Sequence, residues 1–209
     1  MRAVAYSGDA ATLVVAGQLP FVYVFNASTG KAKLHPETRQ PLELEYSQWV
    51  YTAQFSPTGL LACGGYENNV KIFDVGTGEK VHILRCVDVV RDLCFSYPSG
   101  KMIAVGGKDN KVTLFETETA KVLRTIDKEH EVRTIEMSPR GELLASGDTS
   151  SLLELHMLRT FEEFHSIGKK DESPFLRKVH ERRLAPASPW LIHSWPSPPH
   201  PPLFLFTGA

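Results

Sequence analysis

The chain has 209 residues, of which 42% are hydrophobic and 22% are charged, and its net charge is −1 with histidine counted as neutral. This composition is typical of a folded chain with one sizeable core, and the balanced charge gives no overall electrostatic case for nucleic acid or an anionic membrane as a partner. No apolar run reaches the roughly 18 residues of a membrane span, and the residues after Met1 predict a strand rather than a signal peptide.

Residues 1–48 contain the weakest of four similar segments. Their apolar runs, AVAYSGDA, LVVAGQ and VYVFNASTG, alternate apolar with polar residues, which is typical of strands with one buried face. Compared with the later segments, this one carries a longer insert, which we place within His35 to Tyr46.

The stretch from Val50 to Leu84 is the clearest segment. It consists of four short apolar runs separated by turn signals at residues 57–59, 67–69 and 76–78. Turn residues at this density leave no room for helices, so the pattern predicts a four-stranded antiparallel meander. Such a sheet is not stable alone, because its apolar face needs a neighbour.

The neighbours are further copies of the same segment. Phe95 follows Phe55 by 40 residues and Met137 follows Phe95 by 42. The copies align as VYTAQFSPTG, VRDLCFSYPSG and VRTIEMSPRG, followed by LLACGG, MIAVGG and LLASGD. A period near 40 residues with four strands in each copy predicts a radial β-propeller.

The motifs in these copies resemble those of the WD-repeat family over about Met1 to Gly168. They are Ser-Pro-x-Gly at 56–59, Leu-Ala-x-Gly-Gly at 61–65 and Lys-Ile-Phe-Asp at 71–74. The Trp-Asp pair of the family is replaced by Phe73-Asp74, Phe115-Glu116 and Phe25-Asn26. The resemblance implies an all-β propeller of four-stranded blades.

The resemblance also implies a structural hydrogen-bond network between a His, a Ser or Thr, an Asp and a Trp. In the last copy, His130, Ser146 and Asp148 match three members, but Leu155 or His156 stands at the Trp position. We therefore expect packing between the blades to depend on apolar burial.

The predicted blades cover about 1–48, 49–88, 89–129 and 130–167, with the last outer strand at Glu163–Ile167. Aligning Tyr6 with Phe55 places Met1 opposite Val50, so we expect each blade to be continuous in sequence. WD-repeat propellers usually close with about six to eight blades. We therefore expect an open, incomplete ring, and a closed four-bladed ring and self-association of two halves remain alternatives.

Residues 168–209 differ from the repeats in composition. Their net charge is +3, and Ser173-Pro174 followed by FLRKVHERRLA predicts a short basic helix over 174–184. Seven prolines between Pro186 and Pro202 exclude a helix or a sheet interior there, so we expect a basic and then proline-rich tail that is mostly disordered.

No motif in the chain indicates catalysis. The Glu43/Glu45 pair and the Gly-Gly pairs lack the partners that chemistry would need, so we expect no enzymatic activity, no cofactor and no metal. The three cysteines are odd in number and outside any CxxC motif, which favours reduced thiols and a cytoplasmic or nuclear location.

Interaction residues can be assigned only through the resemblance. Family geometry places Tyr51, Arg91 and Arg133 at the start of the inner strands, and Tyr66 and Lys108 on the loops after the second strands. Tyr and Arg are enriched at interaction hot spots, although any one of these residues could equally be an ordinary exposed side chain.

The sequence thus predicts a non-enzymatic scaffold that binds other proteins, with self-association through open blade edges and without membrane or nucleic-acid partners. One alternative is a nucleic-acid-associated protein that uses the basic tail with Trp190 and Trp195. Another is a truncated, non-functional gene product.

Overall fold

The computed structural model describes residues 1–158 and 176–183. These residues form strands, turns and links without a helix, and the strands make up four antiparallel sheets of four strands each. Within each sheet, strands that follow one another in sequence also pair in space. The all-β fold and the four-stranded units predicted from the repeats are therefore confirmed. The described residues contain no helix of the length and apolar character needed to cross a membrane.

The first sheet comprises β1 (Ala3–Tyr6), β2 (Thr12–Ala16), β3 (Phe21–Asn26) and β4 (Glu43–Glu45). The second comprises β5 (Val50–Phe55), β6 (Leu60–Gly65), β7 (Asn69–Asp74) and β8 (Lys80–Arg85). The third comprises β9 (Val90–Phe95), β10 (Met102–Gly107), β11 (Lys111–Glu116) and β12 (Val122–Asp127). The fourth comprises β13 (Val132–Met137), β14 (Leu143–Asp148), β15 (Leu152–Leu158) and β16 (Leu176–Arg183).

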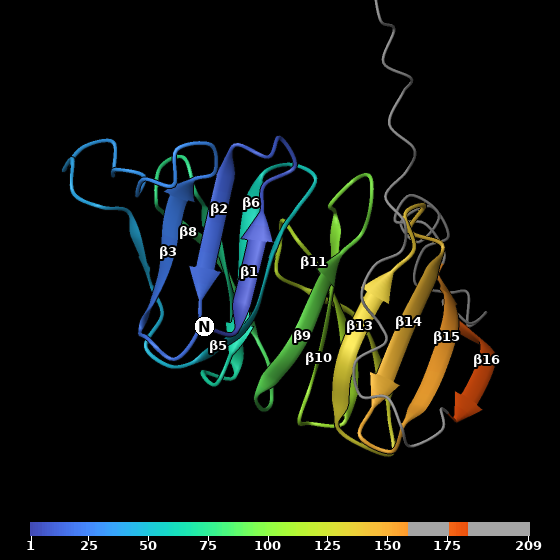
Figure 1. Cartoon of the computed structure of the whole chain (residues 1–209). Coiled ribbons are helices and arrows are strands. Elements are labelled where there is room, and N and C mark those ends of the chain that lie inside the picture. Colours follow the sequence, from blue (N-terminus) through green and yellow to red (C-terminus); the bar gives the residue numbers. More distant parts are fainter. Residues whose placement is uncertain (159–175, 184–209) are drawn as a thin grey trace, which may run out of the picture.

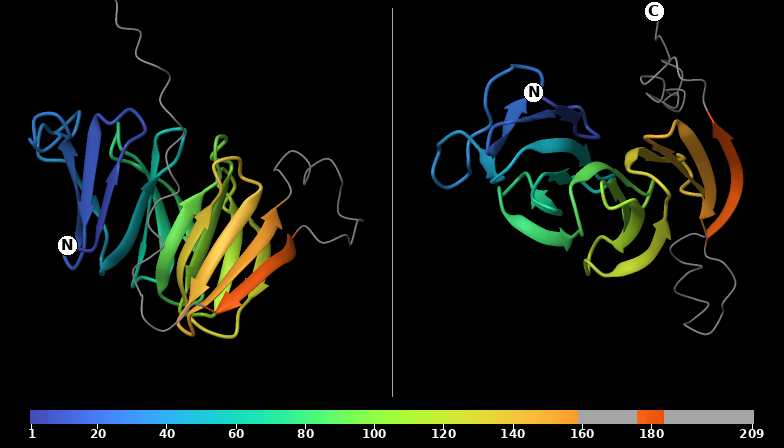
Figure 2. Two further views of the ribbon diagram at one scale, coloured as in Figure 1. Left: turned by 45° about the vertical axis from the view of Figure 1, so that its right-hand side comes forward. Right: turned by 90° about the horizontal axis from the view of Figure 1, so that it is seen from below.

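The four sheets follow one another in an arc (Figures 1 and 2). Their first strands β1, β5, β9 and β13 are neighbours along the inside of the arc. The view from below in Figure 2 shows no sheet of the described chain between the first sheet and the fourth. The arrangement is that of a partial propeller, as the number of repeats predicted.

Each pair of adjacent sheets buries its own apolar core. The first interface contains Val22 and Leu44 from one sheet and Leu61 from the next, all at most 1% exposed. Two further cores of the same kind separate the second sheet from the third and the third from the fourth. Burial of apolar area between the sheets therefore stabilises the arc.

Glycine in the repeated Gly-Gly motif lets the sheets approach closely. A Cβ atom at Gly64 would lie 2.5 Å from Cγ1 of Val90, and one at Gly106 would lie 2.6 Å from Cγ1 of Val132. Real side chains do not tolerate such distances, so this position must lack a side chain if the inner strand of the next sheet is to pack against it.

The fourth sheet differs from the prediction at its outer edge. The short helix predicted over 174–184 is wrong, because Leu176–Arg183 forms strand β16 and pairs antiparallel with β15 along its length. Unpaired backbone groups on the edge of β15 offer hydrogen bonds that local helix propensity does not outweigh. The outer strand predicted at Glu163–Ile167 and the proline-rich tail lie outside the described residues.

In the last repeat, the described side-chain hydrogen bonds of Asp148 stay within its own turn. Asp148 accepts hydrogen bonds from Ser150 and Leu152 within its own turn, and His130 is exposed. Several described hydrogen bonds that join neighbouring sheets lie near the first strands, where the candidate site is found.

Candidate functional site

The second residues of three inner strands lie at one end of the arc. These residues are Tyr51 of β5, Arg91 of β9 and Arg133 of β13, each directly after a buried valine. Because the inner strands are neighbours and run in the same sense, equivalent positions come close to one another. Residues about 40 positions apart in sequence therefore lie in one row.

Tyr51 contacts arginines on both neighbouring sheets. The guanidinium carbon of Arg91 lies 4.9 Å from the centroid of the Tyr51 ring, and that of Arg2 lies 5.4 Å from it. Both distances are within the range of cation–π attraction. When Tyr6 is aligned with Phe55, Arg2 lies opposite Tyr51. Arg2 therefore occupies the equivalent position on the first sheet. Sequence analysis missed Arg2, although the alignment of Tyr6 with Phe55 contained the signal.

Arg91 and Arg133 are joined by a shared carboxylate. Nε of Arg91 donates a hydrogen bond of 2.5 Å to Oε1 of Glu131, and a terminal nitrogen of Arg133 lies 3.4 Å from Oε2 of the same residue. The side chain of Arg133 is 52% exposed, whereas those of Arg91 and Glu131 are 22% and 18% exposed. Glu131 thus holds two arginines in place, and sequence analysis did not identify it because the pairing depends on neighbouring sheets.

Two exposed aromatic residues extend this row. The Tyr66 ring lies 6.3 Å from that of Tyr51 and 6.1 Å from that of Trp49, the latter in an edge-on arrangement. Trp49 is 41% exposed and Tyr66 is 51% exposed. Tilted and edge-on aromatic contacts at these distances are favourable, so the three rings form a joined group.

Lys108 lies at the same end of the third sheet. Its backbone N–H donates to the carbonyl of Val89 at 2.9 Å, just as that of Tyr66 donates to the carbonyl of Trp49. The structure therefore places Lys108 at the position equivalent to Tyr66, with its side chain exposed. We call the whole group the inner rim, and it comprises Arg2, Trp49, Tyr51, Tyr66, Arg91, Lys108, Glu131 and Arg133.

A hydrogen-bonded group around Asp92 lies next to the inner rim. Thr52 and Thr134 donate their hydroxyl groups to the two carboxylate oxygens of Asp92 at 3.0 and 3.1 Å, and the backbone N–H of Ile135 donates at 2.9 Å. Burial raises the pKa of Asp92, while hydrogen bonds from Ile135 and Thr52 act in the opposite direction. One carboxyl group thereby connects the second, third and fourth sheets directly beneath the row of arginines.

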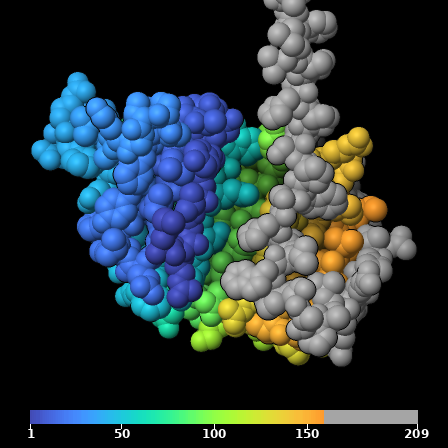
Figure 3. All heavy atoms as spheres, in the orientation of Figure 1, coloured from blue at the N-terminus to red at the C-terminus, as the bar shows by residue number. Residues whose placement is uncertain are grey.

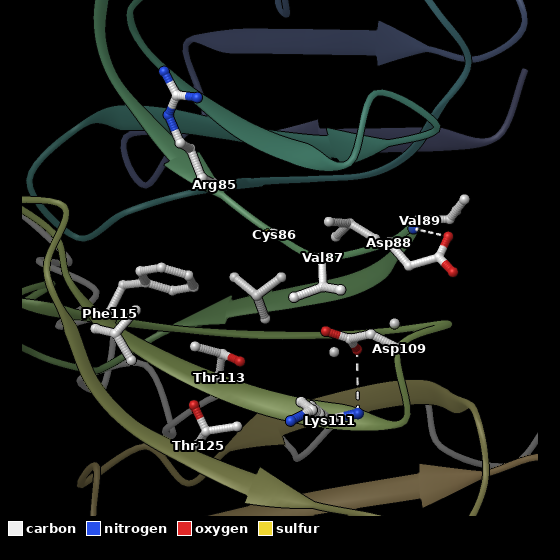
Figure 4. A pocket seen from close by; sticks show the side chains of 15 residues that line it. Arg85, Cys86, Val87, Asp88, Val89, Asp109, Lys111, Thr113, Phe115 and Thr125 are labelled. Atoms are coloured by element: carbon white, nitrogen blue, oxygen red, sulfur yellow. Dashed lines mark hydrogen bonds between the residues drawn. The ribbon is translucent and has the colours of Figure 1, made fainter.

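A small pocket lies between the β8–β9 link and the third sheet (Figure 4). Its volume is about 170 Å³, and valines supply much of its lining. Asp88 accepts a hydrogen bond from the N–H of Val89 at 2.7 Å, and Asp109 accepts one from the N–H of Lys111 at 3.1 Å. Both carboxylates accept hydrogen bonds from backbone N–H groups of their own turns. The pocket is therefore a gap in packing rather than a candidate binding site.

The cysteines do not form a chemical site. Cys63, Cys86 and Cys94 are free thiols. Burial raises the pKa of Cys86 to about 12, and it also raises the pKa values of Cys63 and Cys94. Such thiols stay protonated at neutral pH and react slowly. Among the described residues, no group of three His, Cys, Asp or Glu side chains is placed to hold a metal ion.

Two family models match parts of the chain. The model described as "WD domain, G-beta repeat" matches residues 40–74, and that described as "Anaphase-promoting complex subunit 4 WD40 domain" matches residues 87–132. The two matches cover β4 to β7 and the third sheet, and they include the inner rim residues from Trp49 to Glu131.

Curated relatives are similar over longer stretches. "Cleavage stimulation factor subunit 50" of Arabidopsis thaliana is 26% identical over 66% of this chain and 36% of the relative. "Eukaryotic translation initiation factor 3 subunit I" of Drosophila willistoni is 27% identical over 87% of this chain and 54% of the relative. "Small ribosomal subunit protein RACK1" of Neurospora crassa is 23% identical over 63% and 45%. The aligned part thus spans about half or less of these relatives.

Proposed function

Because the chain belongs to the WD-repeat family, we propose that it is a non-enzymatic scaffold that binds other proteins through the inner rim. One observation carries this proposal: residues from four sheets meet in a connected row whose outer members are exposed. Arginine, tyrosine and tryptophan are the residue types that contribute most at protein interfaces. The names of the matched relatives, a ribosomal subunit protein and a translation factor subunit among them, support membership of an assembly.

The binding residues that we propose are Tyr51, Tyr66, Arg91, Lys108 and Arg133. Tyr51 and Arg91 are half-buried and hold their neighbours in position, whereas Tyr66, Lys108 and Arg133 present exposed surface. A partner would therefore contact the last three directly, and changes at Tyr51 or Arg91 would also disturb packing between the sheets.

Affinity purification of the full chain from cells, with mass spectrometry of what co-purifies, tests the proposal. The double variant Tyr66→Ala, Arg133→Ala should lose partners that the natural chain retains, because it removes one aromatic and one cationic contact without opening the core. Tyr97→Ala, Arg140→Ala is the matched control, since both residues are exposed in turns at the opposite end of the sheets.

Equal loss in both variants, or no loss in either at unchanged thermal stability, would contradict the assignment of the inner rim as the binding surface.

A second candidate function is self-association. Val4 and Tyr6 on the first sheet are 49% and 60% exposed, although the equivalent residues Ala53 and Phe55 of the second sheet pack against a neighbouring sheet. The face that carries them is turned toward the viewer in Figure 1, and Figure 3 shows it as surface. An exposed apolar face of this kind favours association with another sheet.

We propose a cytoplasmic or nuclear location, supported by the free thiols of Cys63, Cys86 and Cys94.

A further inference from the structure

The inner rim concentrates positive charge on an acidic body. Residues 1–167 contain 17 basic and 21 acidic side chains, so their net charge is −4. The inner rim nevertheless holds four cations, and Glu131 is its one anion. Arg2, Arg91 and Arg133 stand at equivalent positions of the first, third and fourth repeats, and Lys108 follows β10 of the third.

Three lysines elsewhere in the described chain, Lys71, Lys111 and Lys128, each have a carboxylate partner. Lys71 lies 2.9 Å from Glu67, Lys128 pairs with Glu154, and both pairs are largely buried. The inner rim differs, because Glu131 neutralises at most one of the two arginines that it contacts. Local positive charge therefore remains on Arg133, Lys108 and Arg2, whose side chains reach solvent.

An apolar contact area lies next to Arg2 and Arg91. Trp49 and Tyr66 are both partly exposed, and their edge-on contact fixes the rings beside Tyr51 and its arginines. Rings that are already ordered lose little conformational entropy when they bind an apolar side chain. The surface thus combines an apolar area with two arginines that contact the adjoining Tyr51 ring.

We propose that the inner rim binds an acidic linear segment of a partner protein. Carboxylates of the segment pair with Arg133, Lys108 and Arg2, and one apolar or aromatic side chain packs on Trp49 and Tyr66. Arginine suits this role because its planar group donates two parallel hydrogen bonds to a carboxylate. This inference rests on the proposed function and adds the chemical class of the partner.

The same observations favour a peptide over nucleic acid. Glu131 lies within the row, and the surrounding body is acidic, so a long polyanion would meet repulsion beyond the first few contacts. DNA presents about one charge per 1.7 Å of helix axis and gains affinity from many phosphate contacts. A short acidic segment needs only the few cations that the inner rim provides.

Fluorescence anisotropy with the full chain tests the proposal. The probe is a labelled peptide of about a dozen residues that alternates Glu and Asp around one Phe, and its matched control replaces every carboxylate with the amide. Since charge-assisted contacts provide the affinity, we expect the acidic probe to bind at least about tenfold more tightly at low salt, and this preference to shrink as salt shortens the Debye length.

Charge-reversal variants locate the binding. Arg133→Glu and Lys108→Glu should each weaken binding of the acidic probe by about tenfold, because each replaces an attraction with a repulsion of similar size. Arg140→Glu changes the net charge of the protein equally but lies at the opposite end of the sheets, and it should leave binding within about twofold. Binding of the acidic probe by the Arg133→Lys variant tests whether the positive charge at this position is enough for binding.

Equal affinity for the acidic and amide probes, or equal weakening by Arg140→Glu, would overturn the proposal. Tighter binding of an oligothymidine of equal charge would overturn it in favour of nucleic acid. If the acidic probe fails while Tyr66→Ala, Arg133→Ala still loses cellular partners, the acidic class is wrong and the scaffold function stands. If those partners are retained as well, both proposals fail.

Discussion

At the scale of single residues, the turns between the third and fourth strands of the sheets require a left-handed backbone. Gly30 and Gly78 have φ angles of +67° and +82° in the first two sheets, and Ala120 has +57° in the third. A left-handed conformation costs an L-residue other than glycine roughly 1–2 kcal/mol. The third sheet therefore contains strain that the equivalent turns of the first and second sheets avoid.

We expect Ala120→Gly to raise the free energy of unfolding by up to about 1 kcal/mol, because it relieves this strain while losing only one methyl group. Urea denaturation of both proteins measures the change. Gly78→Ala is the reverse substitution and should destabilise, since its Cβ would also lie 2.8 Å from Cδ1 of Leu42. A less stable Ala120→Gly protein would contradict the strain account.

At the scale of elements, Asp92 connects three inner strands that share no backbone ladder. Its partners Thr52, Thr134 and Ile135 come from the sheets on either side. Thr52, Asp92 and Thr134 are the third residues of β5, β9 and β13. The middle repeat thus has Asp where its neighbours have Thr, and this difference allows the hydrogen bonds between the three strands. A buried carboxyl with several donors fixes geometry even where its net contribution to stability is small.

The pH dependence of stability reports on this link. Because burial raises the pKa of Asp92, the folded chain keeps the proton to a higher pH than the unfolded chain. Stability is therefore greatest below the unfolded value near 3.8 and falls as pH rises through the raised folded pKa. Asp92→Asn does not titrate, so we expect its stability relative to the natural chain to increase between about pH 4 and pH 7.

Urea midpoints across this pH range measure the effect. The pKa of Glu136 is also raised, by burial and by Asp92, and it gives a dependence of the same sign. Glu136→Gln therefore serves as the second variant that separates the two groups. A constant stability difference between Asp92→Asn and the natural chain at all pH values would exclude a role for the Asp92 proton.

Element patterns also explain what the sequence could predict. The alternation of apolar residues and the turns at 57–59 and 76–78 specify strands locally, so the first three sheets follow from the sequence alone. The segment 174–184 was predicted as a helix because its local signals, a proline at the first turn and apolar residues on one face, do not reveal the free edge of β15. Pairing with β15 therefore determines that this segment is a strand.

The sequence predicted which positions form the candidate site, but it did not predict the contacts between their side chains. The family resemblance implied that Tyr51, Arg91 and Arg133 take equivalent positions, and the structure brings them to one end of the arc. The bridge through Glu131 and the contact of Arg2 with Tyr51 depend on the distance between adjacent sheets, which repeat spacing does not supply.

At the scale of the whole molecule, stacking of sheets continues only as long as each apolar face has a partner. On the first sheet, Val4 pairs with Val15 and Tyr6 with Leu13, and Phe25 lies beside Leu13, so one face carries a contiguous apolar set. On the fourth sheet, Leu143 and Leu155 occupy positions equivalent to Met102 and Leu114, which face the next sheet in the third. The two end faces thus repeat the chemistry of the internal interfaces.

We expect the full chain to self-associate through this first-sheet face, because each large apolar side chain that leaves water contributes about 1.5–3 kcal/mol. Light scattering coupled to size-exclusion chromatography should give a mass above the monomer that grows with concentration. Val4→Lys, Tyr6→Lys should return the mass to the monomer, whereas Val87→Lys, at a site 77% exposed outside this face, should not. A monomeric natural chain at every concentration would show that these apolar residues are not used for association.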